Sequence, residues 1–365
     1  MASEHKIVGL GLQGGGSHTA FTWGVLDRLL DEVEKGNLSI AAMSGASGGA
    51  LTGAVCAYGL MDGPKEAKRL LKALWDAVSS KSLWPVEPYR MLLPKDSPER
   101  WNVDWSPIAI GLGMAEQICS PYWNPWLGNV IGQVIEEVIP DLDRLNAANR
   151  NGPKLFVCAT NVNKTALRIF RAGGTTPGEI TPKTLMASTC LPTLFRAVEI
   201  DGAYYWDGGY MGNPALNPLV DCADDLLTVL IDPLDVAGEP PKNPRQIVNR
   251  INEVSFNASW VWAMWRIELI NQLLSKGFLK RSKYTLKRFH LIRNDRFMEN
   301  IGAASKRNPS RDFVYELRDI GRKCADNWVS SHLKDVGTKS SLDVEKEVAL
   351  RLNGSSPVRA SPEPV

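Results

Sequence analysis

Ser47 lies in a G-x-S-x-G pentapeptide, between a short apolar run at 38–43 and a helix-like stretch at 50–58. This pattern is typical of a nucleophile elbow, a tight strand-to-helix turn that exposes a serine hydroxyl. Gly45 and Gly49 suit such a turn because its backbone is strained and larger side chains would block a substrate. The start of a helix also favours the negative charge that develops when the serine attacks a carbonyl. Read alone, the pentapeptide fits a plain tight turn equally well.

A glycine loop lies about one βα unit upstream of the serine. Gly14, Gly15 and Gly16 follow a candidate strand, Lys6–Leu12, and open a stretch of helical spacing, His18–Glu34. Consecutive glycines at a helix start can aim bare amide groups at an oxyanion, which acyl transfer requires.

The same loop has a competing interpretation as a dinucleotide-binding motif. Gly9, Gly11 and Gly14 match G-x-G-x-x-G, but the next strand ends at Met43-Ser44-Gly45 without an acidic residue to hold a ribose. We therefore favour an oxyanion loop and expect no cofactor.

Asp207 completes the set of candidate reactive groups. It directly follows the apolar segment Ala203–Trp206 and precedes two glycines. An aspartate at the end of a strand could approach Ser47 and accept its proton. A single Asp-Gly-Gly is more often a hairpin turn, so the combination of the three motifs carries the prediction.

Together these motifs resemble the patatin-like phospholipase family, whose pattern joins a G-G-G-x-R/K-G loop, a G-x-S-x-G elbow and a D-G-G/A motif. The resemblance extends from about residue 6 to about residue 234. It implies Ser47 as nucleophile, Asp207 as general base, and the amides of Gly14, Gly15 and Gly16 as oxyanion donors. The implied activity is that of a carboxylic ester hydrolase on lipids, of the phospholipase A or lysophospholipase type, with an acyl-enzyme intermediate and no metal.

The chain departs from the family pattern in one place. His18 and Thr19 stand where the family usually has Arg or Lys followed by Gly. A histidine can titrate near neutrality, so His18 is a candidate for a pH-dependent contact with a lipid head group. The alternative is that His18 packs at the start of the helix.

Two other functions stay open at this stage. An ordinary Ser-Asp-His triad could recruit His290 or His332, since both follow Asp207 in the chain. The elbow follows only the second candidate strand, however, and this favours the Ser-Asp dyad. A non-enzymatic lipid-binding or membrane-docking protein is the second alternative, although such a protein would need none of the three motifs together.

The elements that must position these residues alternate along the chain. We expect strands and helices to form a three-layer α/β/α sandwich, patatin-like, with a mostly parallel central sheet and helices on both faces. The expected strands are Lys6–Leu12, Ser39–Met43, Leu155–Thr160, Ala166–Phe170, Ala203–Trp206, Leu226–Ile231 and Phe289–Arg293.

The domain organisation follows from composition. We expect an acyl hydrolase domain over 1–295, a helical C-terminal extension over 296–353, with a helix at Asp312–Lys334, and a disordered tail over 354–365. A stretch rich in tryptophan and proline, 80–138, is predicted to be a cap or the wall of an acyl-chain pocket, or to fill the core.

Composition and the pattern of cysteines predict a cytoplasmic enzyme. The chain has 365 residues, 44% hydrophobic content and a net charge of +2, which gives no indication of nucleic-acid binding. No apolar run is long enough to predict a membrane span, and the N-terminus does not suggest a signal peptide. Six scattered cysteines are expected to be reduced thiols.

One segment suggests peripheral contact with a membrane. Trp260, Trp262 and Trp265 are followed by the basic stretch Lys276–Arg288, which has six cations and no acid. Interfacial aromatics followed by cations can bind an anionic lipid surface, whereas a buried helix with a solvated basic end is the alternative. The sequence does not predict an oligomeric state.

Overall fold

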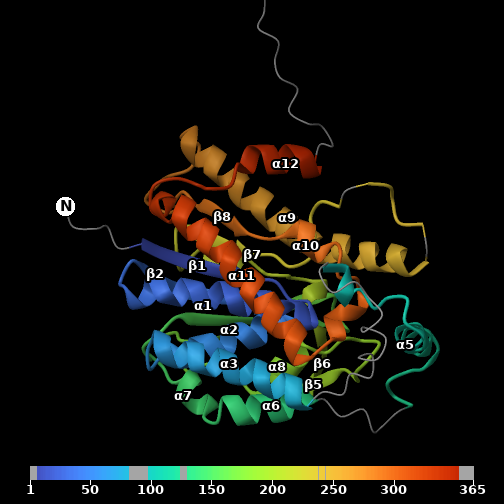
Figure 1. Cartoon of the computed structure of the whole chain (residues 1–365). Helices are drawn as coiled ribbons and strands as arrows, with labels where there is room; N and C mark the ends of the chain where they lie inside the picture. Colours follow the sequence, from blue (N-terminus) through green and yellow to red (C-terminus); the bar gives the residue numbers. More distant parts are fainter. Residues whose placement is uncertain (1–5, 82–97, 124–129, 237, 243, 353–365) are drawn as a thin grey trace, which may run out of the picture.

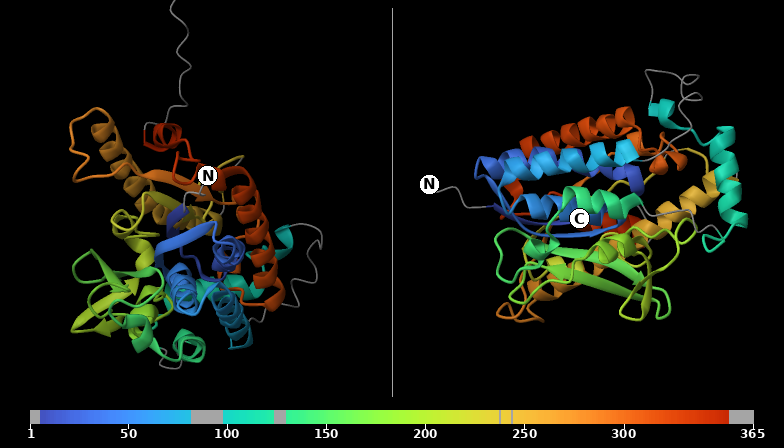
Figure 2. Two further views of the ribbon diagram at one scale, coloured as in Figure 1. Left: turned by 90° about the vertical axis from the view of Figure 1, so that its left-hand side faces the viewer. Right: turned by 90° about the horizontal axis from the view of Figure 1, so that it is seen from below.

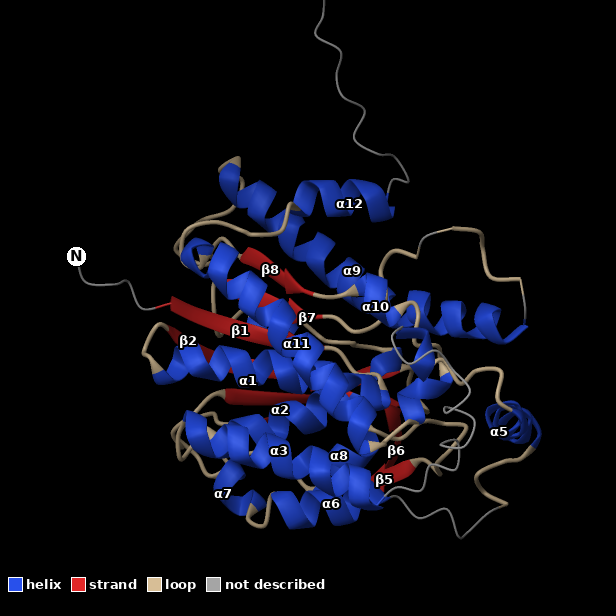
Figure 3. Ribbon diagram, in the orientation of Figure 1, coloured by secondary structure: helices blue, strands red, loops and turns tan. Residues whose placement is uncertain are grey.

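The computed structural model describes residues 6–81, 98–123, 130–236, 238–242 and 244–352. Their eight strands form one sheet in the order β5-β6-β3-β2-β1-β7-β8, with β4 also paired to β3 (Figures 1 and 3). The strands are β1 (Lys6–Leu12), β2 (Leu38–Ala46), β3 (Lys154–Asn161), β4 (Ala166–Ala172), β5 (Val198–Ile200), β6 (Ala203–Asp207), β7 (Asp225–Val229) and β8 (Arg288–Ile292).

The pairing of the strands confirms a mostly parallel sheet. β3, β2, β1, β7 and β8 are parallel neighbours, and β4, β5 and β6 add antiparallel pairings at one side. All seven expected strands are present, with small shifts of their ends. The three-residue strand β5 was missed because it is too short to show a hydrophobic alternation.

Helices cover both faces of this sheet, so the predicted α/β/α sandwich is confirmed (Figure 2). The α-helices of the described residues are α1 (Ala20–Glu34), α2 (Ser47–Gly59), α3 (Pro64–Lys81), α5 (Pro107–Ile118), α6 (Val130–Val138), α7 (Leu142–Asn146), α8 (Pro182–Ser188), α9 (Pro244–Ser275), α10 (Asp295–Met298), α11 (Arg311–His332) and α12 (Val344–Leu352).

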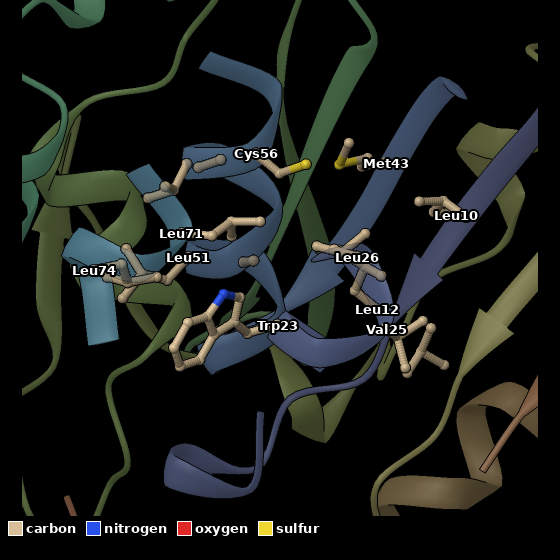
Figure 4. Close-up of a cluster of buried hydrophobic side chains, with 14 of the residues drawn as sticks. Leu10, Leu12, Trp23, Val25, Leu26, Met43, Leu51, Cys56, Leu71 and Leu74 are labelled. Carbon is tan, nitrogen blue, oxygen red and sulfur yellow. The ribbon is translucent and has the colours of Figure 1, made fainter. Parts of the chain in front are cut away.

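Two hydrophobic clusters bind these layers together. The larger cluster joins α1, α2, α3 and α11 to one face of β1 and β2, and Figure 4 shows part of it around Trp23, Leu26 and Leu51. The second cluster packs α9 and α12 against the opposite face through residues such as Trp260 and Met264. Burial of these side chains provides the main driving force for folding and holds the ends of the strands in place.

Helix α11, from the expected C-terminal extension, belongs to the same helical layer as α1, α2 and α3. It packs along α1, where Gly24 and Gly321 allow the two backbones to touch. Arg322 adds ion pairs to Asp27 and Asp31 of α1. The predicted domain boundary at residue 295 stays a prediction, and the predicted disordered tail 354–365 lies outside the described residues.

The described parts of the predicted cap, 80–138, differ in how they pack. Its last part, α6, buries Val134, Ile135 and Val138 against α3 and α8. Its middle part, α5, stands at the rim of the molecule (Figure 1). Trp84 and Trp126 lie outside the described residues. Across the described part of the chain, no helix is long and apolar enough to cross a membrane.

Candidate active site

Ser47 occupies a strained turn between β2 and α2. Its φ is 53°, in the left-handed region that a side chain rarely adopts, and it is the first residue of α2. A Cβ atom on Gly49 would lie 2.4 Å from the Leu12 carbonyl oxygen, and one on Gly45 would lie 2.7 Å from the backbone of α2. The two glycines therefore permit the turn, as a nucleophile elbow requires.

The register of the sheet brings Asp207 to this serine. β2 pairs with β3 as far as Ala46 opposite Cys158, and β6 continues on β3 with Asp207 opposite Ala159. Since β4 occupies the other edge of β3, β2 and β6 must share one edge. Asp207 therefore lies directly beyond the end of β2, next to Ser47, which is the residue that follows β2.

The carboxyl group of Asp207 is buried and only partly satisfied. Its Oδ1 accepts a hydrogen bond of 2.8 Å from the Gly209 amide. No described residue forms a regular hydrogen bond with its Oδ2. Burial raises the pKa of Asp207 to about 6, although the Gly209 amide and the nearby Ser47 hydroxyl oppose the shift. A carboxyl group with a pKa near 6 is well suited to act as a general base near neutral pH.

The glycine loop presses against the serine, but its three amides differ. A Cβ atom on Gly14 would lie 2.6 Å from the Cβ of Ser47, so only glycine fits there. The Gly14 amide donates to Asn213 Oδ1 at 2.7 Å, so the expectation of three free oxyanion donors is wrong for Gly14. No described residue accepts a hydrogen bond from the amides of Gly15 or Gly16.

Two buried side chains that the sequence did not reveal hold this arrangement together. Asn213 also donates from Nδ2 to the Gly14 carbonyl at 3.3 Å, and its backbone N–H donates to the Ser259 hydroxyl of α9. Ser188, at the end of α8, accepts a hydrogen bond of 3.0 Å from the Ser47 amide. Neither belongs to the three motifs, and only their neighbours in space show what they do.

A family model described as patatin-like phospholipase matches residues 10–220, more than half of the chain. The chain belongs to the patatin-like phospholipase family. A comparison with curated proteins gave no match. Among solved structures, the crystal structure of VipD from Legionella pneumophila matches with a TM-score of 0.41 and 17% sequence identity, and the alignment covers 90% of this chain and 67% of that one.

Membership in this family supports lipid acyl hydrolase activity in general. Among the described residues, no group of three or more His, Cys, Asp or Glu side chains could hold a metal ion.

His18 does not occupy the position of a head-group contact in this patatin-like protein. Its side chain is buried, with Nε2 2.7 Å from the Ser305 hydroxyl and its ring against Phe313. Burial and the positive charge of Lys306 hold the pKa of His18 well below its usual value. The structure therefore contradicts a titrating surface contact and supports packing at the start of the helix.

A lysine from a distant part of the sequence lies beside the glycine loop instead. Lys306 belongs to the short helix η5 (Ala304–Arg307), and its carbonyl oxygen contacts Gly16. Its ammonium group pairs with the buried carboxylate of Asp232 at 2.5 Å. His18 stands at the loop position where the family pattern has Arg or Lys. The positive charge beside this loop comes instead from Lys306 of η5.

The two histidines considered for a triad lie away from Ser47. His290 Nε2 is 2.9 Å from Asp225 Oδ1, at the end of the sheet opposite Ser47. His332 Nδ1 is 3.0 Å from Asp335. A Ser47-Asp207-His triad is therefore wrong for this structure.

The suggested membrane segment is only partly exposed. Trp260 is buried, and its indole nitrogen donates to Thr228 in the core. Lys287 and Arg288 are tied to Asp224 and Asp225. Trp260 cannot contact a membrane, because the apolar face of α9 around it packs on the sheet.

Proposed function

We propose that this protein is a serine acyl hydrolase that cleaves ester bonds of lipids, of the phospholipase A or lysophospholipase type, through a Ser47-Asp207 dyad. One observation carries the proposal: a serine in a strained turn lies beside a buried carboxyl whose pKa is raised to about 6. Strain and an unsatisfied buried carboxyl both cost stability, and such costs concentrate at functional sites.

In the first half of the reaction, the Ser47 hydroxyl oxygen attacks the carbonyl carbon of the ester while Asp207 accepts the hydroxyl proton. The carbonyl oxygen becomes an oxyanion, which the amides of Gly15 and Gly16 and the N-terminus of α2 stabilise. The intermediate collapses when the bond to the alcohol oxygen breaks. Asp207 returns its proton to this leaving group, and the acyl chain stays on Ser47.

In the second half, water replaces the alcohol. Asp207 takes a proton from the water as its oxygen attacks the acyl-serine carbonyl, and the same amides hold the second oxyanion. Collapse breaks the bond to the Ser47 oxygen, which regains the proton from Asp207, and the fatty acid leaves. No histidine is needed in this cycle.

Active-site labelling tests the nucleophile. A fluorophosphonate should phosphonylate Ser47 in the parent protein, and peptide mass spectrometry should locate the label there. Ser47→Ala should abolish labelling, and Asp207→Asn should slow it at least about 10²-fold, because the serine then lacks its base. Ser44→Ala is the matched control, since this buried serine hydroxyl donates to the Ala215 carbonyl and lies beside Cys158 rather than Asp207.

A substrate panel then separates the lipid classes. Phospholipids, lysophospholipids, acylglycerols and short p-nitrophenyl esters, assayed with parent and Ser47→Ala protein, should show hydrolysis only by the parent. Release of fatty acid from the glycerol esters of phospholipids or lysophospholipids is the expected result. Vesicle binding without labelling or hydrolysis would replace the proposal with a non-enzymatic lipid-binding function.

A further inference from the structure

The helix α5 carries its apolar side chains on the outside of the molecule. Met114 is 58% exposed and Ile118 is 69% exposed, and Ala109 is the one buried residue among its described side chains. The other large exposed apolar residues on or beside the helix are Trp105, Ile108, Ile110, Leu112, Tyr122 and Trp123. A helix with so few buried side chains gains little from packing in water, so a partner that covers it would stabilise it.

The first turns of α9 expose a second set of aliphatic side chains. Ile247, Ile251 and Val254 follow one another at intervals of four and three residues, so they lie on one face of the helix, with Val248 beside them. Figures 1 and 2 place this part of α9 at the same end of the molecule as α5. We call these exposed side chains of α5 and of α9 the apolar rim.

The apolar rim reaches the candidate active site through α9, and its α5 side is bonded to the residues just before β5. Phe256, two residues beyond Val254 in α9, packs edge-on against Tyr210, which lies three residues after Asp207, with ring centroids 5.4 Å apart. At the α5 side, the Tyr122 hydroxyl accepts a hydrogen bond of 3.2 Å from the Ala197 amide, and Arg196 donates to the Tyr122 carbonyl.

A third link ties the beginning of the α5 segment to the glycine loop. Asp104 accepts hydrogen bonds from the amides of Ala303 and Ala304, at the start of η5. The same short helix contributes the Lys306 carbonyl that touches Gly16. The segment that bears α5 is therefore held at its start by η5, beside the glycine loop, and at its end by Arg196 and Ala197.

We propose that the apolar rim docks on the surface of a lipid bilayer and so delivers ester groups to Ser47. The proposal rests on the proposed function, because the continuity of the rim with a site for lipid esters is what identifies lipid as the partner. The composition agrees with this partner: aliphatic side chains form the middle of α5, and Trp105, Tyr122 and Trp123 stand at its ends, where aromatic rings favour a membrane interface. With 12 residues, α5 can lie on a bilayer but cannot cross it.

The basic stretch Lys276–Arg288 is a different surface. It leads into the start of β8, at the opposite end of the sheet from Ser47, and Phe278 within it is 73% exposed. A bilayer bound there would lie far from the serine. The two surfaces also predict different salt dependence, since an apolar rim binds neutral lipid whereas a basic loop requires anionic lipid.

Vesicle binding by the full chain tests the proposal. Ser47→Ala protein should co-sediment with phosphatidylcholine vesicles, with or without phosphatidylserine, so that binding is measured without hydrolysis. Adding Met114→Asp and Ile118→Asp should weaken this binding at least about tenfold, because two apolar contacts become charges. The matched control is Phe278→Asp, an equally exposed apolar residue on the other surface, which should leave binding unchanged.

Activity assays on the same substitutions with an intact serine distinguish docking from damage. Hydrolysis of vesicle phospholipid should fall with binding, whereas hydrolysis of a soluble p-nitrophenyl ester should stay within about twofold of the parent. Equal vesicle binding by the rim variant and the parent would overturn the proposal. So would a change in oligomeric mass, measured by light scattering, without a change in vesicle binding, since the rim would then join two copies of the chain. Rim-dependent binding by a protein that fluorophosphonate does not label would support docking and refute the proposed catalysis.

Discussion

Two buried aspartates at opposite ends of the sheet have opposite properties. Asp207 ends β6 beside Ser47, and Asp225 begins β7 at the other end. Burial alone would raise the pKa of both carboxyls. At Asp225 the hydrogen bonds from His290, Arg288 and the Gly337 amide outweigh burial and lower the pKa to about 2. At Asp207 the Gly209 amide and the Ser47 hydroxyl do not outweigh burial, which raises the pKa to about 6.

The difference teaches that hydrogen-bonding partners, as well as burial, separate a structural carboxylate from a reactive one. The Asp225 carboxylate is paired with a guanidinium and an imidazole and has little capacity left to accept a proton. Asp207 has one firm hydrogen bond and one oxygen that is not satisfied by the described residues. A proton acceptor needs this second arrangement, and the protein gives up some stability to maintain it.

Asp207→Asn should produce the largest effect and separate the two ends of the sheet. An amide cannot accept the Ser47 proton, so ester hydrolysis should fall at least about 10³-fold while the protein keeps its fold. Asp225→Asn should keep ester hydrolysis but lower the free energy of unfolding by about 3 kcal/mol, because the partly buried Arg288 loses its carboxylate. Steady-state kinetics and urea unfolding of both variants measure the contrast. Similar losses of activity in both, with the fold intact, would contradict it.

The sequence predicted the framework of this site and missed the contacts that complete it. Ser47 and Asp207 stand in motifs whose glycines follow from backbone geometry, so local sequence was enough to find them. Their meeting depends on the register of β2 and β6 along β3, a non-local property, so the sequence offered it as a possibility that the family resemblance strengthened.

The roles of Asn213, Ser188 and Lys306 could not be predicted, because each acts through a residue far away in the chain. The Gly14 amide was expected to be free until Asn213 was found to accept its hydrogen bond. The two interpretations of His18, a head-group contact or packing at the start of the helix, could not be separated because its neighbours Ser305 and Phe313 lie nearly 300 residues later. The exposure of α5 was also hidden, since its apolar composition is equally typical of a core helix.

His290→Ala tests whether the far end of the sheet contributes to catalysis. Removing the imidazole deletes a buried hydrogen bond to Asp225 and a ring packed edge-on against Trp328, so unfolding free energy should drop by about 2–4 kcal/mol. Ester hydrolysis by the folded protein should remain within about twofold of the parent, because no step of the dyad mechanism uses histidine. Thermal unfolding and kinetics below the transition provide the two values. A folded variant without activity would restore a triad.

The dependence on pH compares the two carboxyls within the unchanged protein. Asp207 must be ionised to accept a proton, so kcat/KM should rise through about pH 6 and level off above it, and at pH 5 it should be about tenfold below the plateau. An unfolded chain releases the same proton near pH 4, so the folded state holds it over a wider range. Ionisation of Asp207 therefore costs stability, and this cost appears as the pH rises from about 4 to about 6.

Asp225 contributes in the opposite direction and in a different window. Its stabilisation is complete above about pH 4 and is lost as the pH falls toward 2. Unfolding of the parent and of Asp207→Asn at a series of pH values isolates the first carboxyl. The variant should gain on the parent by up to about 3 kcal/mol between pH 4 and pH 7, because an amide never ionises. A difference that stays constant over this range would mean that Asp207 titrates as an ordinary carboxyl, and the contrast between the two ends of the sheet would then lose its physical basis.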